Sequence, residues 1–454
     1  MFRKKKHSTF EEHIKLTELF GKADGATKAS YVVMGAANLA NKQYLKGILF
    51  LLLEISYVTW LFTFGLKAYH NMITLGTHAQ RLKMDPKLGI EVLKPGDNSM
   101  LLLLWGMLAL IITVLFILLY RVNLHSARRI WELKQLKTKL PTLREDLASL
   151  LNEKMYVTLM AIPLTGVLLF TVLPLIYMIS IAFTSYDHNH LPPKNLFSWV
   201  GFSNFGNVIS GDMASTFFPV LAWTLCWAVI ATISSFFLGV ILAMMINAKG
   251  IRGKKIFRTI FILTMAIPAI ISLLIMKNMF DDGGLVNTFL MNLGIVKQAV
   301  PFFTDPWIAK ITIIVVNLWI GIPATMLVTT GILQNQSQDQ VEAAEIDGAN
   351  KFQIFKSITF PQILFVMAPS LIQQFIGNVN NFNVIYLLTG GGPANSNYYG
   401  AGSTDLLITW LYNLTLNTAD YNLASVIGIL IFILSAVFSL VAYKKVSNSG
   451  MEAL

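Results

Sequence analysis

Long apolar segments recur along the chain and alternate with polar ones. Each is long enough to cross a hydrocarbon core of about 30 Å, which takes roughly 20 helical residues. Because lipid offers no partner for an unpaired backbone amide or carbonyl, we expect these segments to be helices. The pattern predicts eight membrane spans, at about 46–66, 99–120, 155–183, 216–246, 257–280, 307–332, 362–389 and 421–443.

A polar stretch separates the first two spans from the other six. The sequence therefore predicts an all-α polytopic membrane protein, in which a six-helix core follows two added N-terminal spans. Its expected parts are a cytoplasmic N-terminal extension over 1–45, two additional transmembrane helices with an extracellular loop over 46–120, a cytoplasmic linker over 121–154, and the core over 155–445.

Lysine and arginine predict the orientation of these spans. With the N-terminus inside, the inner segments hold 26 basic residues and the four outer loops hold 7. Cytoplasmic loops of membrane proteins carry such an excess, so both termini are predicted to be cytoplasmic. The first outer loop, about 67–98, departs from this pattern because it carries five of those seven.

Composition agrees with the membrane interpretation. Hydrophobic residues make up 55% of the chain and charged residues 13%, against about 25% charged in soluble proteins. The net charge of +11 lies mainly in the inner loops, where it is a topology signal, and we expect no nucleic-acid partner. The single cysteine, Cys226, cannot form an internal disulfide, and no Cys/His spacing suits a metal.

The N-terminal segment stays polar for about forty residues, whereas a secretory signal would place an apolar stretch nearer the start. We interpret it as a cytoplasmic extension, and a poorly ordered, solvated tail is the alternative. The chain also lacks a glycine-rich phosphate loop, so we do not expect it to hydrolyse ATP.

The inner loop between the sixth and seventh spans, about 338–361, predicts two short helices. Gln338 to Ile346 forms an amphipathic helix, and Gly348 suits its left-handed end. A second helix over 349–358 places three apolar side chains on one face: Phe352, Phe355 and Ile358. Pro361 then marks the start of the seventh span. Such a loop needs a partner, which is either the inner end of its own bundle or a groove on a soluble protein.

Amide side chains line the seventh span, and amides in hydrocarbon are costly unless they are paired. Gln374, Asn378 and Asn381 fall at i, i+4 and i+7, which is one helical face. Asn317 and Gly321 in the sixth span are one turn apart. Interhelical hydrogen bonds are one explanation. The other is a polar cavity that binds the hydroxyls of a neutral sugar, because each amide offers two donors and an acceptor.

Several residues of the inner loop follow a spaced pattern: Glu342, Ala343, Ala344, Asp347, Gly348, Ala349, Ile358 and Pro361. This pattern resembles the EAA loop of permease subunits in binding-protein-dependent ABC importers. The resemblance implies that the loop is a coupling helix, which seats in a cleft of a cytoplasmic ATPase. It also implies that Glu342 to Gly348 transmit ATP-driven closure to the spans, and that Ala349 belongs to the same set of coupling residues.

A wider match covers roughly residues 155–445. It is carried by Ile267-Pro268, Asn317-Leu318-Trp319-Ile320-Gly321-Ile322-Pro323, Asn378-Val379-Asn380-Asn381-Phe382, Leu387-Leu388-Thr389, Gly391-Gly392-Pro393 and Asp405-Leu406-Leu407. These segments resemble the larger permease subunit of maltose importers, MalF. That subunit carries a large extracellular domain in Gram-negative bacteria, whereas the corresponding loop here, about 184–215, is short. The resemblance therefore implies the Gram-positive type.

Some positions of the implied sugar site agree with MalF and others do not. The sugar-contacting positions that match are Asn317, Ile320, Gly321, Asn378 and Asn381. Those that differ are Ala269, Ala324, Gln374 and Gly377, which replace serine, tyrosine, serine and phenylalanine. Two lost aromatics remove stacking surface for a sugar ring. We therefore expect a roomier cavity that includes Gln374 and Gly377, and maltodextrin is the best guess for the substrate.

The resemblance implies an assembly in the bacterial plasma membrane. Its other members would be a second, MalG-like permease subunit, two copies of an ATPase that binds ATP and Mg²⁺, and an extracellular solute-binding lipoprotein. This chain would contact membrane lipid and the oligosaccharide, and would need no cofactor or enzymatic activity of its own. The alternatives are a permease for another oligosaccharide, an ion-gradient-driven transporter and a membrane-embedded enzyme. An ion-driven transporter usually carries intramembrane acids. Glu54 is the only acidic residue within the predicted spans.

Overall fold

The computed structural model describes residues 15–84, 90–248 and 250–451. Seven of its helices are long and apolar enough to cross a membrane, and a bent pair of helices supplies an eighth candidate span. The prediction of a helical, multi-pass membrane protein is therefore confirmed. The chain divides into two compact units, one comprising residues up to 180 together with 189–199, and the other comprising 181–188 together with 200–454.

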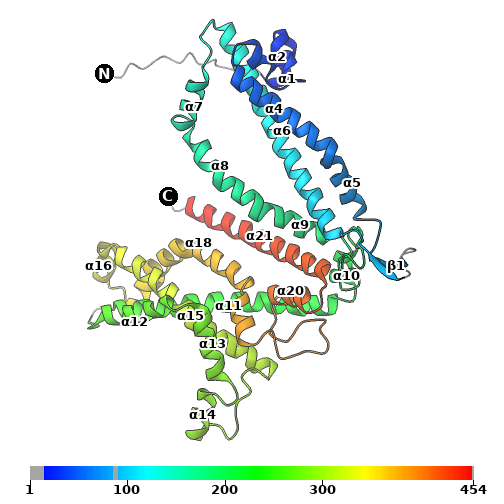
Figure 1. The fold of residues 1–454 in the computed structure, drawn as a ribbon. Coiled ribbons are helices and arrows are strands. Elements are labelled where there is room, and N and C mark those ends of the chain that lie inside the picture. Colours follow the sequence, from blue (N-terminus) through cyan, green and yellow to red (C-terminus); the bar gives the residue numbers. More distant parts are fainter. Residues whose placement is uncertain (1–14, 85–89, 249, 452–454) are drawn as a thin grey trace. The chain divides into compact units, whose positions relative to one another are not determined.

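The first unit contains a long helical hairpin (Figure 1). Its first arm consists of α4 (Tyr44–Trp60), a π turn (Leu61–Gly65) and α5 (Leu66–Thr74). Its second arm is α6 (Ser99–Gln135), which continues well past residue 120, where the second span was predicted to end. Helices α6 and α7 (Leu143–Leu151) occupy most of the predicted linker over 121–154, and its cytoplasmic location stays a prediction.

Three short helices, α1 (Leu16–Lys22), α2 (Gly25–Ala29) and α3 (Ala36–Ala40), pack on the predicted inner end of α6. Leu19 and Ala23 are buried with Trp131, and Ala37 is buried with Ala127 and Ile130. The alternative of a solvated tail is therefore wrong for residues 15–43, and residues 1–14 lie outside the described part.

Buried polar contacts fasten these helices to the hairpin. The Asn123 carboxamide accepts a hydrogen bond from the Gly35 amide (2.8 Å) and donates one to the Ser30 carbonyl (3.0 Å). Glu54 of the first span accepts a hydrogen bond from the Met34 amide (2.8 Å). Glu54 therefore stabilises this packing, a role that the sequence did not suggest.

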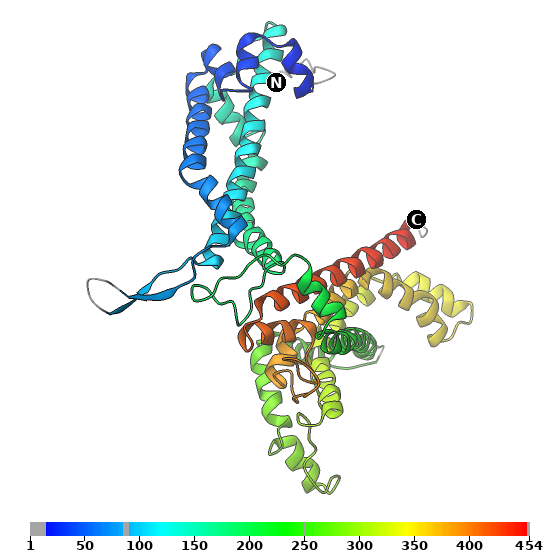
Figure 2. The same cartoon turned by 90° about the vertical axis from the view of Figure 1, so that its right-hand side faces the viewer.

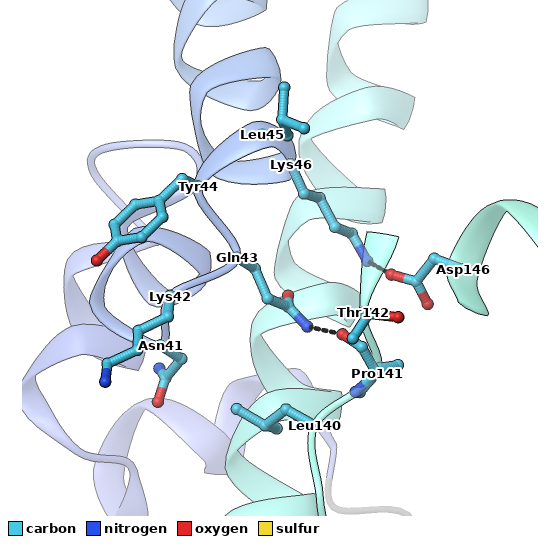
Figure 3. A pocket seen from close by; sticks show the side chains of 10 residues that line it. All are labelled: Asn41, Lys42, Gln43, Tyr44, Leu45, Lys46, Leu140, Pro141, Thr142 and Asp146. Carbon is cyan, nitrogen blue, oxygen red and sulfur yellow. Dashed lines mark hydrogen bonds and ion pairs between the residues drawn. The ribbon is translucent and has the colours of Figure 1, made fainter. Parts of the chain in front are cut away.

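Helix α7 is held against the start of α4. The Lys46 ammonium forms an ion pair with the Asp146 carboxylate (2.9 Å), and the Gln43 side chain donates to the Pro141 carbonyl (2.7 Å) (Figure 3). Arg129 of α6 approaches the same carboxylate at 3.7 Å. The predicted inner end of the first unit is therefore a connected assembly.

The predicted outer loop between the first two spans contains a β-hairpin, so the all-α prediction misses one small feature. Strands β1 (Arg81–Met84) and β2 (Glu91–Lys94) pair in antiparallel register, with Leu82 opposite Leu93 (Figure 2). The third span follows as α8 (Met155–Val167), a π turn (Leu168–Val172) and α9 (Leu173–Ile181). It belongs almost entirely to the first unit, so the compact units do not coincide with the predicted boundary near residue 155. The functional core over 155–445 stays a prediction.

The second unit packs around two long helices, α11 (Ala214–Asn247) and α15 (Pro306–Asn335). Small residues let them approach closely, because a Cβ on Gly239 would overlap Thr325. The fully buried indoles of Trp227 and Trp410 anchor the main core. The remaining helices are α10 (Ser203–Ser210), α12 (Lys254–Ala266), α13 (Ala269–Phe280), α14 (Leu285–Asn292), α16 (Gln338–Ile346), α17 (Lys351–Ile354), α18 (Phe360–Val379), α19 (Phe382–Leu388), α20 (Leu407–Leu416) and α21 (Tyr421–Met451).

The predicted fifth span is broken rather than continuous. Helix α12 ends at Ala266, α13 begins at Ala269, and the two segments bend by 95°. Pro268 lies between them, and its missing N–H and fixed φ end a helix. Proline therefore accounts for the break that divides this span.

Candidate functional site

Helix α16 forms the predicted coupling loop with the predicted bounds, Gln338–Ile346, at the edge of the second unit (Figure 1). Gly348 has a φ of +82°, the left-handed conformation that the sequence predicts. The Gly348 amide donates to the Glu345 carbonyl (3.1 Å), and the Ala349 amide donates to the Ala344 carbonyl (2.9 Å). These bonds turn the chain sharply, and glycine adopts this conformation without steric cost.

None of the nine described residues of α16 is buried. The expected coupling residues Glu342, Ala343, Asp347 and Gly348 are exposed, and Ala344 and Ala349 are half-buried. Two large apolar side chains of the loop are also open to solvent, Ile346 at 85% exposure and Phe352 at 70%. Among the described residues, the helix therefore does not bury itself against the bundle, and exposed apolar groups of this kind mark surfaces for partners.

The second helix of the loop differs from the prediction. Asn350 caps α17, because its side chain accepts from the Gln353 amide (2.9 Å). From there α17, a π turn (Phe355–Thr359) and α18 follow one another without interruption. Pro361 lies in the first turn of α18 rather than at a break. In a π turn one backbone carbonyl lacks its usual i+4 partner. The turn can therefore precede Pro361, which has no N–H to donate to that carbonyl.

The apolar face predicted for this helix is only partly present. Phe355 packs against Phe360, with ring centroids 5.6 Å apart, and Ile358 is half-buried. Phe352, one turn earlier, contributes to the exposed surface instead. The loop therefore exposes two large apolar side chains, Ile346 and Phe352, which we together call the exposed apolar edge.

The amides of the seventh span do not share one helical face as predicted. Helix α18 ends at Val379 and α19 begins at Phe382, so Asn381 lies in the break and not one turn beyond Asn378. The Asn381 side chain accepts from the Val384 amide (3.3 Å) and thereby caps α19. Asparagine in a run of amides competes with the backbone for hydrogen bonds, which favours such a break.

The structure brings together some of the predicted sugar-site residues. The Asn381 side chain donates to the Asn317 side-chain carbonyl (3.3 Å), so the sixth and seventh spans meet through these amides. The buried Asn378 side chain instead donates to the Thr232 hydroxyl of α11 (2.9 Å). The interhelical interpretation therefore describes all three residues, because Asn378 is bonded to α11 and Asn381 to α15.

The other candidate positions differ in accessibility. Gly321 is a packing residue, because a Cβ there would overlap Ser235. Ile320 packs, half-buried, against the main core. By contrast, no described atom lies within 4 Å of a Cβ built on Gly377, and the half-buried Gln374 amide lies 3.9 Å from the Cβ position of Gly321.

Three residues of α11 belong to this region although the sequence analysis did not single them out. Trp227 donates its indole N–H to the Asn378 carbonyl (3.1 Å), and Thr232 accepts from the Asn378 side chain. The buried Ser235 hydroxyl has no hydrogen-bond partner among the described residues. Small hydroxyl residues within an otherwise apolar span were the available signal, because they face neighbouring helices more often than lipid.

A buried carboxylate organises the loop after α19, outside the membrane-spanning helices. Asp405 is 1% exposed, and it accepts from the Gly402 amide (2.8 Å) and the Asn413 side chain (3.2 Å). Gly391 has a φ of +88°, and a Cβ there would overlap the carboxylate. The absence of a side chain at Gly391 thus makes room for Asp405.

Burial raises the pKa of Asp405 to about 6, and the hydrogen bonds only partly offset this rise. Since the folded-state pKa lies above the unfolded one, the folded protein gains stability as the pH falls from 7.5 towards 5. We expect the melting temperature to rise over that interval by the equivalent of about 1.4 kcal/mol, because only about one pH unit of it lies below the folded-state pKa. Thermal denaturation of wild type and Asp405→Asn in detergent measures this rise. The variant should lack it, and equal slopes would contradict the assignment.

Within the described residues, no group of three or more His, Cys, Asp or Glu side chains could hold a metal ion.

Comparison with known proteins places these features in context. Residues 235–449 match the model of the family described as binding-protein-dependent transport system inner membrane component. The chain is 36% identical over 431 residues to the maltodextrin transport system permease protein MdxF of Bacillus subtilis, covering 93% of this chain and 95% of that protein. It is also 36% identical over 426 residues to the galactooligosaccharides transport system permease protein GanP of the same organism, covering 93% and 97%. Both matches extend well beyond the predicted range of 155–445.

A solved structure shows the same fold in part. It is the crystal structure of a bacterial ABC transporter involved in the import of the acidic polysaccharide alginate, and one of its chains superposes with a TM-score of 0.55. The superposition covers 66% of this chain and 98% of that chain, at 23% identity.

Proposed function

The chain belongs to the family of binding-protein-dependent transport system inner membrane components, and we propose that it forms part of the path by which a neutral oligosaccharide enters a bacterial cell. The proposed substrate is a maltodextrin. The observation that carries the proposal is the connection between the exposed coupling loop and the helix that bears the amides. One helical run from Lys351 to Val379 joins them.

This helical run would act as a lever. Its 29 residues span about 43 Å at 1.5 Å per residue, so a displacement at α16 can reach Asn378 and the break at Asn381. A cytoplasmic ATPase, present in two copies and binding ATP and Mg²⁺, would grip α16 through the exposed apolar edge. ATP hydrolysis would thus occur on partner chains, and both termini of this chain would face the cytoplasm.

The remaining proposed partners complete the path. A second, similar permease subunit would face this chain across the cavity, and an extracellular solute-binding lipoprotein would deliver the sugar. Alternating access would then expose the amides to the outside and the inside in turn, as differential binding of the ATPases shifts the equilibrium between the two states.

The substrate-binding proposal rests on uncharged hydrogen-bonding groups beside open space. Gln374 and Asn381, both half-buried, would supply donors and acceptors that suit hydroxyls without a counter-charge. Asn317 is buried and accepts from Asn381, so it would hold that amide in place. Gly377 is exposed and no described atom lies within 4 Å of a Cβ built on it, so this side of α18 is accessible to a ligand. Ile320, Gly321 and Asn378 would shape the wall of this site rather than contact the sugar closely.

A galactooligosaccharide is the second candidate substrate. MdxF and GanP match this chain at the same identity, so overall similarity does not separate the two sugars. Uptake by the reconstituted assembly with radiolabelled maltotriose, maltohexaose and β-1,4-galactotetraose would decide between them. We expect the maltodextrins to be transported, and exclusive uptake of the galactan fragment would contradict the maltodextrin proposal.

The Gly377→Phe substitution tests the position of the cavity. A ring at this open position would take up the space of a glucose unit, so we expect uptake of maltohexaose to fall by more than about tenfold, the equivalent of 1.4 kcal/mol. Maltotriose uptake should fall less. Gly331→Phe is the matched control, because Gly331 is also open and lies about 21 Å along α15 from Asn317. Equal effects of the two variants would contradict the site.

A further inference from the structure

The predicted inner end of the first unit holds a basic cavity of about 360 Å³ where the ends of three spans meet. Lys46 begins the first span, Arg129 lies on α6 beyond the second, and Lys154 directly precedes the third. His125 and Arg128 of α6 also line the cavity. Cationic side chains at the inner ends of several spans are the arrangement that binds anionic lipid headgroups.

Positive charge exceeds negative charge around this cavity. Lys46 and Arg129 share the Asp146 carboxylate, at 2.9 Å and 3.7 Å, and Arg128 lies 3.6 Å from Glu132. The ammonium of Lys154 makes no hydrogen bond or ion pair with the described residues. Within the described part of the chain, Lys46, Arg129 and Lys154 thus have one carboxylate among them, Asp146, which leaves an excess of about two charges for a phosphate group to neutralise.

An apolar groove of about 290 Å³ runs between the two arms of the hairpin, on the predicted membrane side of the cavity. Leu53 and Trp60 line it from α4, and Leu115 and Leu119 line it from α6. Its polar surface is small, and the leucine side chains stay about two-fifths exposed. Such a groove suits an acyl chain.

The groove and the cavity lie on the same helical faces. On α6, Leu115, Leu119, Val122, Ser126 and Arg129 follow one another at spacings of three or four residues. On α4, Lys46 and Leu53 are seven residues apart, which is again one face. The stretch from Ile112 to Arg129 covers about 25 Å, close to the thickness of one leaflet with its headgroups, roughly 20–22 Å.

We propose that this face binds one anionic phospholipid. Its phosphate lies in the basic cavity among Lys46, Arg129 and Lys154, and an acyl chain lies in the groove beside Leu115 and Leu119. The groove distinguishes a lipid from a free phosphate, because a soluble anion has no acyl chain to occupy it. The bound lipid would brace the junction at which Lys46 holds α7 to α4 (Figure 3).

Native mass spectrometry of the full chain in detergent, titrated with dioleoyl phosphatidylglycerol, tests this proposal. Arg129→Gln with Lys154→Gln should weaken binding about thirtyfold, which corresponds to about 2 kcal/mol at 1.4 kcal/mol per tenfold. The matched control is Lys255→Gln with Lys444→Gln, two exposed lysines at other predicted inner helix ends, and it should change binding by less than about twofold. Equal weakening by the two pairs would overturn the proposal.

Further measurements distinguish the lipid from other ligands. Dioleoyl phosphatidylcholine should bind at least about tenfold more weakly than phosphatidylglycerol, because it carries no net charge. Ser56→Trp should fill the groove and weaken phosphatidylglycerol binding while every cation remains. Competition by inorganic phosphate or glycerol phosphate as strong as that of the lipid would assign the cavity to a soluble anion and overturn the lipid proposal. Melting temperatures without lipid confirm that each variant is folded.

Discussion

The Gly348→Pro substitution is expected to abolish oligosaccharide uptake while the chain still inserts into the membrane. Gly348 has a φ of +82°, whereas proline fixes φ near −65°, so the turn between α16 and α17 cannot form as described. Proline also removes the bond from the Gly348 amide to the Glu345 carbonyl. The coupling loop would then point elsewhere and lose its partner. Uptake in reconstituted vesicles measures the loss of transport, and the amount of membrane-inserted chain measures whether insertion is retained.

Graded substitutions at the same position supply the control. Asparagine tolerates the left-handed conformation better than other non-glycine residues, so Gly348→Asn should retain most of the uptake. Uptake by Gly348→Ala should lie between that of the proline and asparagine variants. A Cβ at this position meets no neighbouring atom of the described residues within 4 Å, so only the backbone cost of about 1–2 kcal/mol remains. Full uptake by the proline variant would refute the coupling role of this turn.

The Ile346→Asp substitution is expected to separate the chain from its ATPase. Ile346 is 85% exposed, so the change should alter the stability of the isolated chain by less than about 0.5 kcal/mol. In a docked loop the new carboxylate would enter an apolar contact and lose its water, which costs several kcal/mol. We expect the ATPase that co-purifies with the chain to fall by more than about tenfold, the equivalent of 1.4 kcal/mol.

Ile251→Asp is the matched control for this experiment. Ile251 is 42% exposed and lies in the predicted inner loop between α11 and α12, so it adds the same charge on the same predicted side. It should leave co-purification unchanged. An equal loss of ATPase in both variants would show a general effect of charge and would argue against docking through α16.

The coupling loop was the part of the fold that the sequence predicted best. Its signals are local: a short amphipathic stretch, and a glycine where the helix must reverse. These decide the bounds of α16 and the φ of Gly348 without help from distant residues. The continuation of α17 into α18 was missed because Pro361 suggested a boundary, whereas the preceding π turn accommodates it.

Mean hydropathy alone does not predict the packed inner end of the first unit. Residues 121–135 are polar on average, yet Asn123, Ala127, Ile130 and Trp131 are buried on one face of α6. That helical spacing was present in the sequence and predicts an amphipathic helix. The identity of its partner was not predictable, because the short helices α1 to α3 lie about a hundred residues away along the chain.

The polar site was predicted in its residues and not in its geometry. Asn317 and Asn381 do meet, but through a break in the helix and not along one face. Which amide binds which neighbour depends on the crossing of α11, α15 and α18, and Asn378 binds Thr232 for that reason. The 95° bend at Pro268 is likewise predictable in position and not in angle. Proline ends the helix, whereas tertiary packing sets the angle.

The most direct test of the account is whether a motor protein covers the exposed apolar edge. In a Cys226→Ser background, which removes the one native cysteine, Ile346→Cys places a single thiol at the end of α16. The rate of its reaction with a maleimide is measured before and after the ATPase is added, and Lys255→Cys serves as the exposed control. We predict at least about tenfold protection of Cys at 346, and a cross-link from it to the ATPase, with no change at 255. An unchanged labelling rate at 346 in a complex that still transports sugar would contradict the central claim.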